Sequence, residues 1–195
     1  MLIAFEGLDQ SGKETQAERL ADALRQASHT VELVSFPDYD TTIGAEIGRA
    51  LHGERDYHAD VMQLLYVANR YEYKPRLTEW LAAGRVILCD RYVASSVAYG
   101  ETQGLDAQWL ADVQRHLPQP DLTILLDIAP ATAVARKQTG RDRYERDLAL
   151  LERVRASYRR QAQQAGWVLI DGEQSRDAIA AAVANAVFQG LKARG

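Results

Sequence analysis

Gly7-Leu8-Asp9-Gln10-Ser11-Gly12-Lys13 is the stretch that decides the fold of this chain. It directly follows the short apolar run Leu2–Glu6 and precedes residues with helical spacing. A strand, a glycine-rich turn that ends in Gly-Lys, and a helix are the context that a Walker A phosphate-binding loop requires. The glycines let backbone N–H groups turn toward phosphate oxygens, and the helix N-terminus adds a partial positive charge. We therefore predict a bound nucleotide, with Lys13 at its β- and γ-phosphates, rather than a plain strand-to-helix turn.

One position departs from the Walker A pattern. The residue after the lysine is usually Ser or Thr, whose hydroxyl ligates Mg²⁺, but here it is Glu14, and Thr15 follows. One step along a helix rotates a side chain by about 100°, so Thr15 cannot simply replace that hydroxyl, and we expect it at a neighbouring phosphate oxygen. Two interpretations of Glu14 remain open. Its carboxylate holds Mg²⁺ through a metal-bound water, or it faces solvent and complements the helix dipole.

The rest of the chain alternates short apolar runs with longer helical patterns, which is typical of βαβ units and a parallel sheet. Near-continuous apolar runs indicate strands that are covered on both faces. We therefore predict an α/β fold of the P-loop NTPase type, a three-layer sandwich formed by one domain over residues 1–195. Each of five strands should be followed by a helix, with ligands at the C-terminal ends of the strands. The predicted strands are Leu2–Glu6, Val31–Phe36, Val86–Asp90, Leu122–Asp127 and Trp167–Ile170.

Helix boundaries follow from Pro, Gly and Ser positions. A long helix carries Met62, Leu65, Tyr66 and Asn69 on one face, and Pro75 should end or kink it. Pro130 should begin a helix, and Ser175 should cap the last helix. Another helix is expected from about Arg146 to Ala165, ended by Gly166.

Composition excludes several other classes of protein. The 195 residues carry a net charge of −4, which argues against a nucleic-acid-binding surface. No apolar stretch approaches the roughly 20 residues that span a bilayer, and no signal peptide is visible, so we expect a cytoplasmic protein without membrane contact. The one cysteine, Cys89, lies in an apolar run and is expected in the core. Four scattered histidines without a partner cysteine argue against a zinc site.

A phosphate loop alone indicates a nucleotide and no particular reaction. The remaining motifs, in chain order, are Phe36-Pro37-Asp38-Tyr39, Asn69-Arg70, Asp90-Arg91-Tyr92, Ser95-Ser96-Val97-Ala98-Tyr99, Asp127-Ile128-Ala129-Pro130 and an Arg-rich segment from Arg136 to Arg146. This ordered set resembles the thymidylate kinase family of P-loop nucleoside monophosphate kinases across nearly the whole chain.

The resemblance implies an activity and its partners. Thymidylate kinases transfer the γ-phosphoryl group of ATP to dTMP, with Mg²⁺, which gives ADP and dTDP for dTTP synthesis. The family is usually homodimeric, with long helices packed across the interface. The apolar face of Asp60–Tyr73 could form that interface, although burial within the monomer explains the same pattern. ATP would contact Gly7, Gln10, Ser11, Gly12, Lys13, Glu14, Thr15 and Arg136.

The resemblance also implies how dTMP is bound. Arg91 would bind the acceptor phosphate, Arg70 would read the thymine edge, and Phe36 would stack on the base. The alternative for Arg91 is a surface ion pair, that for Arg70 is a solvated helix arginine, and that for Phe36 is plain core packing. The full set implied for dTMP is Asp9, Phe36, Pro37, Tyr39, Asn69, Arg70, Arg91, Ser95, Ser96 and Tyr99.

Two of these residues surround the expected sugar. Asp9 would bind the deoxyribose 3′-OH and help to hold Mg²⁺ or the acceptor arginine, unless it serves only as a helix N-cap. Tyr99 would close the ribose 2′ side, unless it only packs a helix. Tyr39 occupies a position where many family members carry arginine, which leaves acceptor-phosphate binding more dependent on Arg91.

The Arg-rich segment resembles the family's lid, predicted over residues 136–147. Some thymidylate kinases carry a catalytic arginine where this chain has Gln10, and others carry arginines in the lid, as this chain does. Arg136, Arg141, Arg143 and Arg146 are the candidates, and a solvated charged face is their alternative. Glu145 would approach the metal or the acceptor. The implied catalytic residues are Lys13, Asp9, Arg91, Arg141 and Arg143, and the implied metal-site residues are Asp9, Glu14 and Glu145.

Two rival functions are weighed against this one. Another P-loop deoxynucleoside or nucleoside monophosphate kinase would share the phosphate loop and lid but should lack this order of motifs. A nucleotide-dependent switch would need a base-recognition signature such as Asn-Lys-x-Asp, which the sequence lacks.

Overall fold

The fold was analysed in a computed structural model that describes residues 1–136 and 147–192. Its centre is a five-stranded sheet in the order β2-β3-β1-β4-β5, and every neighbouring pair is parallel. The strands are β1 (Leu2–Glu6), β2 (Val31–Ser35), β3 (Val86–Asp90), β4 (Leu122–Asp127) and β5 (Trp167–Asp171). The predicted parallel α/β sheet is confirmed, and β2 and β5 differ from their predicted bounds by one residue each.

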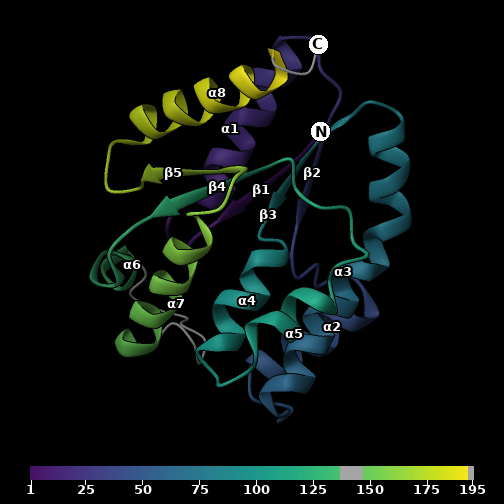
Figure 1. The fold of residues 1–195 in the computed structure, drawn as a ribbon, viewed down its shortest axis with the longest axis vertical. Helices are drawn as coiled ribbons and strands as arrows, with labels where there is room; N and C mark the ends of the chain where they lie inside the picture. The colour runs from purple at the N-terminus through teal and green to yellow at the C-terminus, as the bar shows by residue number, and fades with distance from the viewer. Residues whose placement is uncertain (137–146, 193–195) are drawn as a thin grey trace.

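Helices cover both faces of this sheet. They are α1 (Lys13–Gln26), α2 (Thr42–Leu51), α3 (Ala59–Ala82), α4 (Val93–Glu101), α5 (Ala107–Asp112), α6 (Pro130–Arg136), α7 (Leu148–Gln161) and α8 (Arg176–Lys192). In Figure 1, α1 and α8 lie above the strands, whereas α4 and α7 lie below them. The predicted three layers are therefore present.

Each face of the sheet has its own apolar core. Leu20 and Leu24 of α1 join Val183 of α8 against one face, around Ile3 and Phe5 of β1. The opposite face packs against α3 in one part and against α4 and α7 in another. Cys89 lies in that second core, as predicted, and burial raises the pKa of its thiol. Since β1 is central and apolar on both faces, the loop after it is held over the middle of the sheet.

The connections between strands contain more helices than the one predicted after each strand. Two helices follow each of β2, β3 and β4. The extra helix α2 packs on α3 through Ile47, Ala50 and Met62, away from the sheet. Gly44 and Gly48 lower the helix propensity of this segment, so its sequence signal is weak.

Pro75 was expected to end or kink its helix, and the first of these alternatives was wrong, because α3 continues through Pro75 to Ala82. An internal proline costs about 3 kcal/mol through a lost hydrogen bond and a steric clash. Leu77, just beyond it, is fully buried in the core that α3 shares with the sheet, and Tyr71 and Trp80 pack there too. This tertiary packing outweighs the local cost.

The predicted helix from Arg146 to Ala165 was also placed too long. The helix α7 begins at Leu148, where Asp147 caps it by accepting from the Leu150 N–H at 3.1 Å, and it ends at Gln161. Gly166 has a φ of 82° and accepts a hydrogen bond from the Thr123 N–H, so the chain is already turning into the sheet there. The predicted starts at Pro130 and after Ser175 are confirmed, since Ser175 accepts from the Ala178 N–H at 3.2 Å.

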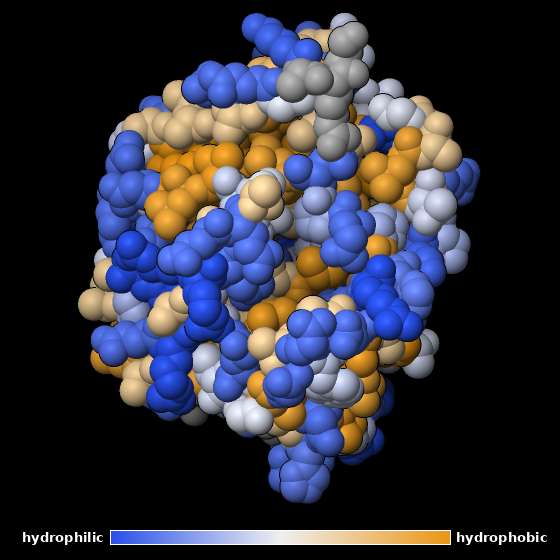
Figure 2. Space-filling model, in the orientation of Figure 1, coloured by the Kyte–Doolittle hydropathy of each residue, from blue (hydrophilic) through white to orange (hydrophobic). Residues whose placement is uncertain are grey.

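The edge strand β5 leaves some apolar surface uncovered. Figure 2 shows an apolar band beneath the paler surface of the alanine-rich α8. Leu169 is paired with the buried Leu125 in the sheet register but is itself 48% exposed, so the helix cover stops short of the edge. Among the described residues, none of the helices has the length and apolarity that crossing a bilayer requires.

A pair of glycines on α2 provides a stability test. A Cβ on Gly44 would lie 1.6 Å from the backbone oxygen of Asp38, whereas one on Gly48 would lie 3.4 Å from a Tyr39 ring carbon. We expect Gly44→Ala to lower the free energy of unfolding by about 2 kcal/mol or more, because the backbone must move. Gly48→Ala, the matched control, should raise it by roughly 0.5–1 kcal/mol through helix propensity. Urea unfolding of both variants measures this, and equal effects would contradict the close approach at Gly44.

Candidate active site

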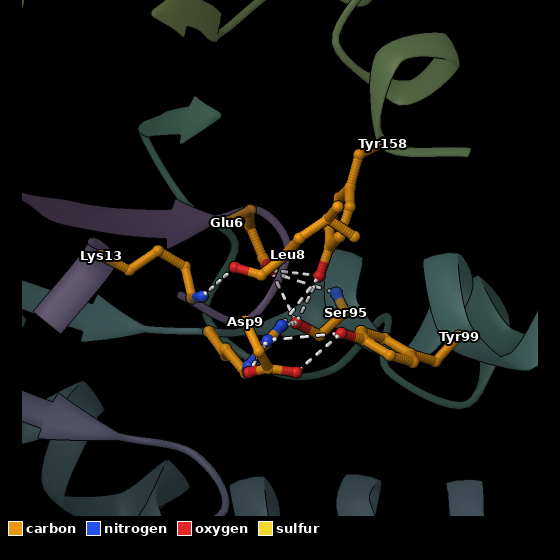
Figure 3. Close-up of polar contacts among 8 residues, drawn as sticks. Glu6, Leu8, Asp9, Lys13, Ser95, Tyr99 and Tyr158 are labelled. Atoms are coloured by element: carbon orange, nitrogen blue, oxygen red, sulfur yellow. Dashed lines mark hydrogen bonds and ion pairs between the residues drawn. The ribbon is translucent and has the colours of Figure 1, made fainter. Parts of the chain in front are cut away.

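The phosphate loop between β1 and α1 has a backbone that turns inward. Gly7, Gln10 and Gly12 have positive φ angles of 142°, 64° and 92°. A Cβ on Gly7 would lie 2.5 Å from the backbone oxygen of Leu126 in β4, so the loop packs directly on the neighbouring strand. The buried ammonium of Lys13 donates to the Leu8 carbonyl at 2.9 Å, across the mouth of the loop (Figure 3). Burial lowers the pKa of this amine.

A cleft surrounds this loop, and we call it the phosphate cleft. Its lining is Asp9, Gln10, Ser11, Gly12, Lys13, Glu14, Thr15, Gln16, Asp90, Arg136, Gly172, Gln174, Arg176 and Ile179. Of the residues predicted to bind ATP, all but Gly7 line it. Arg136 of α6 donates to the backbone oxygens of Gln10 at 3.0 Å and Gly172 at 3.1 Å, so it spans the cleft from the loop to the end of β5.

A second cavity, which we call the adjoining cavity, opens on the other side of Asp9. Its lining is Asp9, Phe36, Pro37, Tyr39, Leu51, Gln63, Tyr66, Arg70, Arg91, Ser95, Ser96 and Tyr99. Except for Asn69, every residue that the resemblance implied for dTMP is in this set. Leu51, Gln63 and Tyr66 were missed by sequence reasoning. Gln63 and Tyr66 stand seven and four positions before Arg70 on α3, so helical periodicity counted from Arg70 would have found them.

An ion pair separates the two spaces. Arg91, whose φ is 63°, donates to an Asp9 carboxylate oxygen at 2.6 Å, and the Tyr99 hydroxyl donates to the other oxygen at 3.2 Å. Burial opposes ionisation of Asp9, but the charges of Arg91 and Lys13 and the hydrogen bonds from Arg91 and Tyr99 outweigh it. They lower the Asp9 pKa to about 2. Burial also opposes the Arg91 charge, but Asp9 raises the Arg91 pKa, so both groups stay ionised at neutral pH.

Arg70 is held deep in the adjoining cavity and is only 3% exposed. Its guanidinium donates to the Ser96 hydroxyl at 2.8 Å and to the side-chain oxygen of Gln114 at 3.0 Å. Gln114 was not predicted, and its own amide donates to the Leu110 carbonyl, which orients it. Burial lowers the Arg70 pKa. The alternative of a solvated helix arginine is therefore wrong.

Asn69 lies behind the cavity wall. Its amide oxygen accepts from the Asp38 N–H at 2.8 Å, and its amide nitrogen donates to the Thr41 hydroxyl at 2.8 Å. These bonds hold the loop that carries Phe36 and Tyr39. Both ends of the Asn69 amide are thus engaged within the protein, and its implied contact with dTMP stays a prediction.

Phe36 belongs to the core and to the cavity wall at once. Its ring packs edge-on against Tyr73, with centroids 5.4 Å apart, and tilted against Tyr92 at 5.7 Å. It is only 2% exposed, and the cis peptide bond to Pro37 follows it. Tyr66 also lines the cavity and is only half-buried, so it offers a second aromatic surface to a ring-shaped ligand.

The residues around the phosphate cleft are compatible with a magnesium ion carried by phosphates. Within residues 1–136 and 147–192, no three carboxylate, His or Cys side chains gather into a metal-binding group. One oxygen of Asp90, at the end of β3, is buried without a hydrogen-bond partner, and Asp90 lines the cleft next to Lys13. Mg²⁺ commonly keeps several waters and takes one or two carboxylates besides phosphate oxygens. Asp90 was not among the residues predicted for the metal site, although an Asp at a strand end could have drawn attention to it.

The other predicted residues divide into two groups. Glu14 and Thr15 are exposed on the first turn of α1 and line the cleft. Arg141, Arg143, Glu145 and Arg146 lie outside the described residues.

Comparisons with known proteins agree with this geometry. A sequence model of the family Thymidylate kinase matches residues 5–183. The thymidylate kinase of Schizosaccharomyces pombe is 38% identical over 159 residues, which cover 82% of this chain and 75% of that protein. The human thymidylate kinase is 34% identical over 181 residues, which cover 91% of this chain and 85% of that protein. A solved thymidylate kinase structure from Candida albicans superimposes with a TM-score of 0.86 at 28% identity, covering 97% of this chain and 92% of the other. This chain therefore belongs to the thymidylate kinase family.

Proposed function

We propose that this chain transfers the γ-phosphoryl group of ATP to the 5′-phosphate of dTMP, giving ADP and dTDP for dTTP synthesis. The observation that carries the proposal is the shared wall of the two cavities. Asp9 lines both the phosphate cleft and the adjoining cavity, and Arg91 stands beside it. A reaction between two phosphate esters needs two anion-binding spaces that meet at the transferred group.

ATP fits the phosphate cleft in this proposal. Lys13 exchanges its contact with the Leu8 carbonyl for the β- and γ-phosphates, to which the loop N–H groups also donate. Arg136, which spans the cleft toward β5, lies beside the nucleotide. The lid arginines Arg141 and Arg143 would add charge to the transferring phosphoryl group when the lid closes.

dTMP fits the adjoining cavity. Arg91 is the cation nearest the phosphate loop there, and it binds the acceptor phosphate. Arg70 and Ser96, already paired at 2.8 Å, face the edge of the base. Tyr99, hydrogen-bonded to Asp9, stands on the sugar side, where the pair leaves little room for a 2′-hydroxyl.

The chemistry needs no general base, because the attacking phosphate oxygen is already ionised. Catalysis then rests on positioning and on neutralising charge. Mg²⁺ carried by the nucleotide would supply part of that neutralisation. Asp90, with its unpartnered oxygen, would hold the ion, and Glu14 and Asp9 are further candidates. The cytoplasmic location stays a prediction.

The deciding experiment measures ADP formation by the purified protein with ATP, Mg²⁺ and one acceptor at a time. We expect turnover to depend on dTMP, and kcat/KM to fall from dTMP to dUMP and further to UMP. Turnover with another nucleoside monophosphate in preference to dTMP would replace this proposal by the related kinase activity. Equal values for dUMP and UMP would remove the role of Tyr99 and Asp9 in sugar selection.

Replacing the two cavity arginines should separate their roles. Arg91→Ala should cost about 2–5 kcal/mol in transition-state stabilisation, because a charge pair with the acceptor phosphate in a partly desolvated site is lost. Arg70→Ala should mainly raise KM for dTMP, since its contacts are with the base. Steady-state kinetics at varied dTMP measures both, with circular dichroism to establish folding. A folded Arg91→Ala enzyme with near-normal turnover would exclude Arg91 as the acceptor-phosphate ligand.

The magnesium dependence of turnover should identify the carboxylates that hold the ion. We expect Asp90→Asn to need clearly more Mg²⁺ for half-maximal rate. If Glu14 also holds the metal through water, Glu14→Gln should shift the curve the same way and Glu14→Ser should recover activity by restoring a hydroxyl. Unchanged curves for both Glu14 variants would leave that residue only its interaction with the helix dipole. An unchanged curve for Asp90→Asn would remove Asp90 from the metal site.

We also propose that the chain forms a homodimer through α3. On α3, Met62 and Val67 are buried inside the chain. Val61 and Leu64 on the same helix remain 39% and 44% exposed. In a two-fold interface the same patch of both subunits meets, so Val61 and Leu64 of each copy would be buried against the other copy.

A charge in that patch tests the dimer. Leu64→Glu should shift sedimentation from dimer to monomer, because two carboxylates would face each other across the two-fold axis. Leu169→Glu introduces the same change on the exposed edge of β5 and should leave the dimer intact. A monomeric wild-type protein, or dimers in both variants, would contradict the α3 interface.

A further inference from the structure

Glu6 is a buried carboxylate that neither cavity exposes. It ends β1 immediately before the phosphate loop, is 0% exposed, and lines neither the phosphate cleft nor the adjoining cavity. One of its oxygens accepts from the backbone N–H groups of Tyr92 at 2.9 Å and Ser95 at 3.3 Å. The other accepts from the Ser95 hydroxyl at 2.6 Å and the Tyr158 hydroxyl at 3.0 Å. Figure 3 shows Glu6 directed at Ser95 and Tyr158, on the side of the site opposite Tyr99.

The first oxygen takes the place of a helix cap. Tyr92 is the N-cap residue of α4, but its side chain does not cap the helix, and its hydroxyl donates to the Pro118 carbonyl instead. The first N–H groups of a helix need acceptors, and a carboxylate is favourable at their positive end. Glu6 supplies that acceptor from the end of β1. It thereby ties the start of α4, which carries Ser95 and Tyr99, to the strand that leads into the phosphate loop.

The second oxygen orients two hydroxyl groups. An ionised carboxylate only accepts, so the Ser95 proton points at Glu6, and the Tyr158 proton points at Glu6 or at Ser95, 2.8 Å away. In either arrangement both hydroxyl oxygens turn lone pairs toward Arg91. The Arg91 guanidinium donates to Ser95 at 3.2 Å and to Tyr158 at 3.1 Å from the same nitrogen. Its other terminal nitrogen is then free to contact Asp9 at 2.6 Å.

Glu6 also contributes charge. Burial lowers the pKa values of Lys13 and Arg70, and the charge of Glu6 acts on both in the opposite direction. Without Glu6, these two buried cations would lose a nearby opposite charge, which is costly in a site of low polarity.

We propose that Glu6 is a positioning residue for the acceptor phosphate. Through Ser95 and Tyr158, Glu6 holds the Arg91 guanidinium in the position and orientation in which that guanidinium meets the phosphate. Glu6 itself touches neither substrate. This inference rests on the proposed dTMP kinase activity.

Glu6→Gln replaces one acceptor oxygen by an amide nitrogen without changing the shape of the side chain. An amide nitrogen in place of the second oxygen donates to Ser95 and Tyr158, so one hydroxyl proton loses its acceptor and turns toward Arg91. We expect KM for dTMP to rise about tenfold or more, while KM for ATP stays within about twofold of wild type, because only the acceptor arginine is displaced. A loss of general structure would instead raise both KM values. Calorimetric titration of the variant with dTMP and with ATP compares the two affinities without turnover.

Tyr158→Phe provides the second variant and the coupling test. It removes one of the two hydroxyl links and leaves the cap on α4 in place, so KM for dTMP should rise, though less than in Glu6→Gln. Tyr71→Phe, which removes a hydroxyl bonded to the Val113 carbonyl elsewhere on the molecule, is the matched control and should change neither KM. If Glu6 acts through Tyr158, the double variant should be less impaired than the product of the single effects predicts.

The outcomes separate this inference from the proposed function. A wild-type protein that neither binds nor phosphorylates dTMP contradicts the proposed function. Wild-type activity with unchanged dTMP affinity in a folded Glu6→Gln variant overturns the positioning role, as does an equal rise in both KM values. If Glu6→Gln does not fold, Tyr158→Phe decides: a selective rise in KM for dTMP supports the role, and unchanged kinetics overturn it.

Discussion

The ion pair between Asp9 and Arg91 is the interaction on which the rest of the site depends. It joins the phosphate loop after β1 to the end of β3, and it forms the wall between the two cavities. Both partners lie where a lone charge would be expensive, so each keeps the other ionised. Under the proposed function, this pair places Arg91 beside the site of transfer, and the acceptor phosphate would need to reorganise little of the protein.

Around this pair, several buried polar residues hold the residues of the cavity walls in place. Asn69 holds the loop that carries Phe36, and Gln114 orients Arg70. Glu6 does the same for Arg91 through two hydroxyl groups. Each acts through hydrogen bonds that fix a side chain or a loop, and a reaction that relies on position rather than on acid–base chemistry gains most from such support. Many buried polar residues, such as Lys13, Arg70 and Ser95, line the two cavities, and Glu6, Asn69 and Gln114 support them from behind.

Much of the fold was predictable because the informative patterns are local. Short apolar runs located all five strands to within a residue. The phosphate loop was recognisable because its glycines and lysine lie within seven positions of one another. Helix lengths were less predictable. The packing of Leu77 carries α3 through Pro75, and pairing of Gly166 with the sheet shortens α7. In both places a tertiary contact outweighs the local preference of the backbone.

The sequence by itself determined the five strands, the glycine-rich loop after the first of them, and the position of Arg91 at the end of the third. The tertiary structure decided which polar groups meet. Gln114 reaches Arg70 across 44 positions, and Tyr158 reaches Glu6 across 152. Tyr66 and Gln63 enter the cavity only because α3 presents that face to it. The periodicity of apolar residues indicates which face of a helix or strand is buried. It does not indicate which other element covers that face. Partners so distant in sequence are set by how whole helices pack on the sheet.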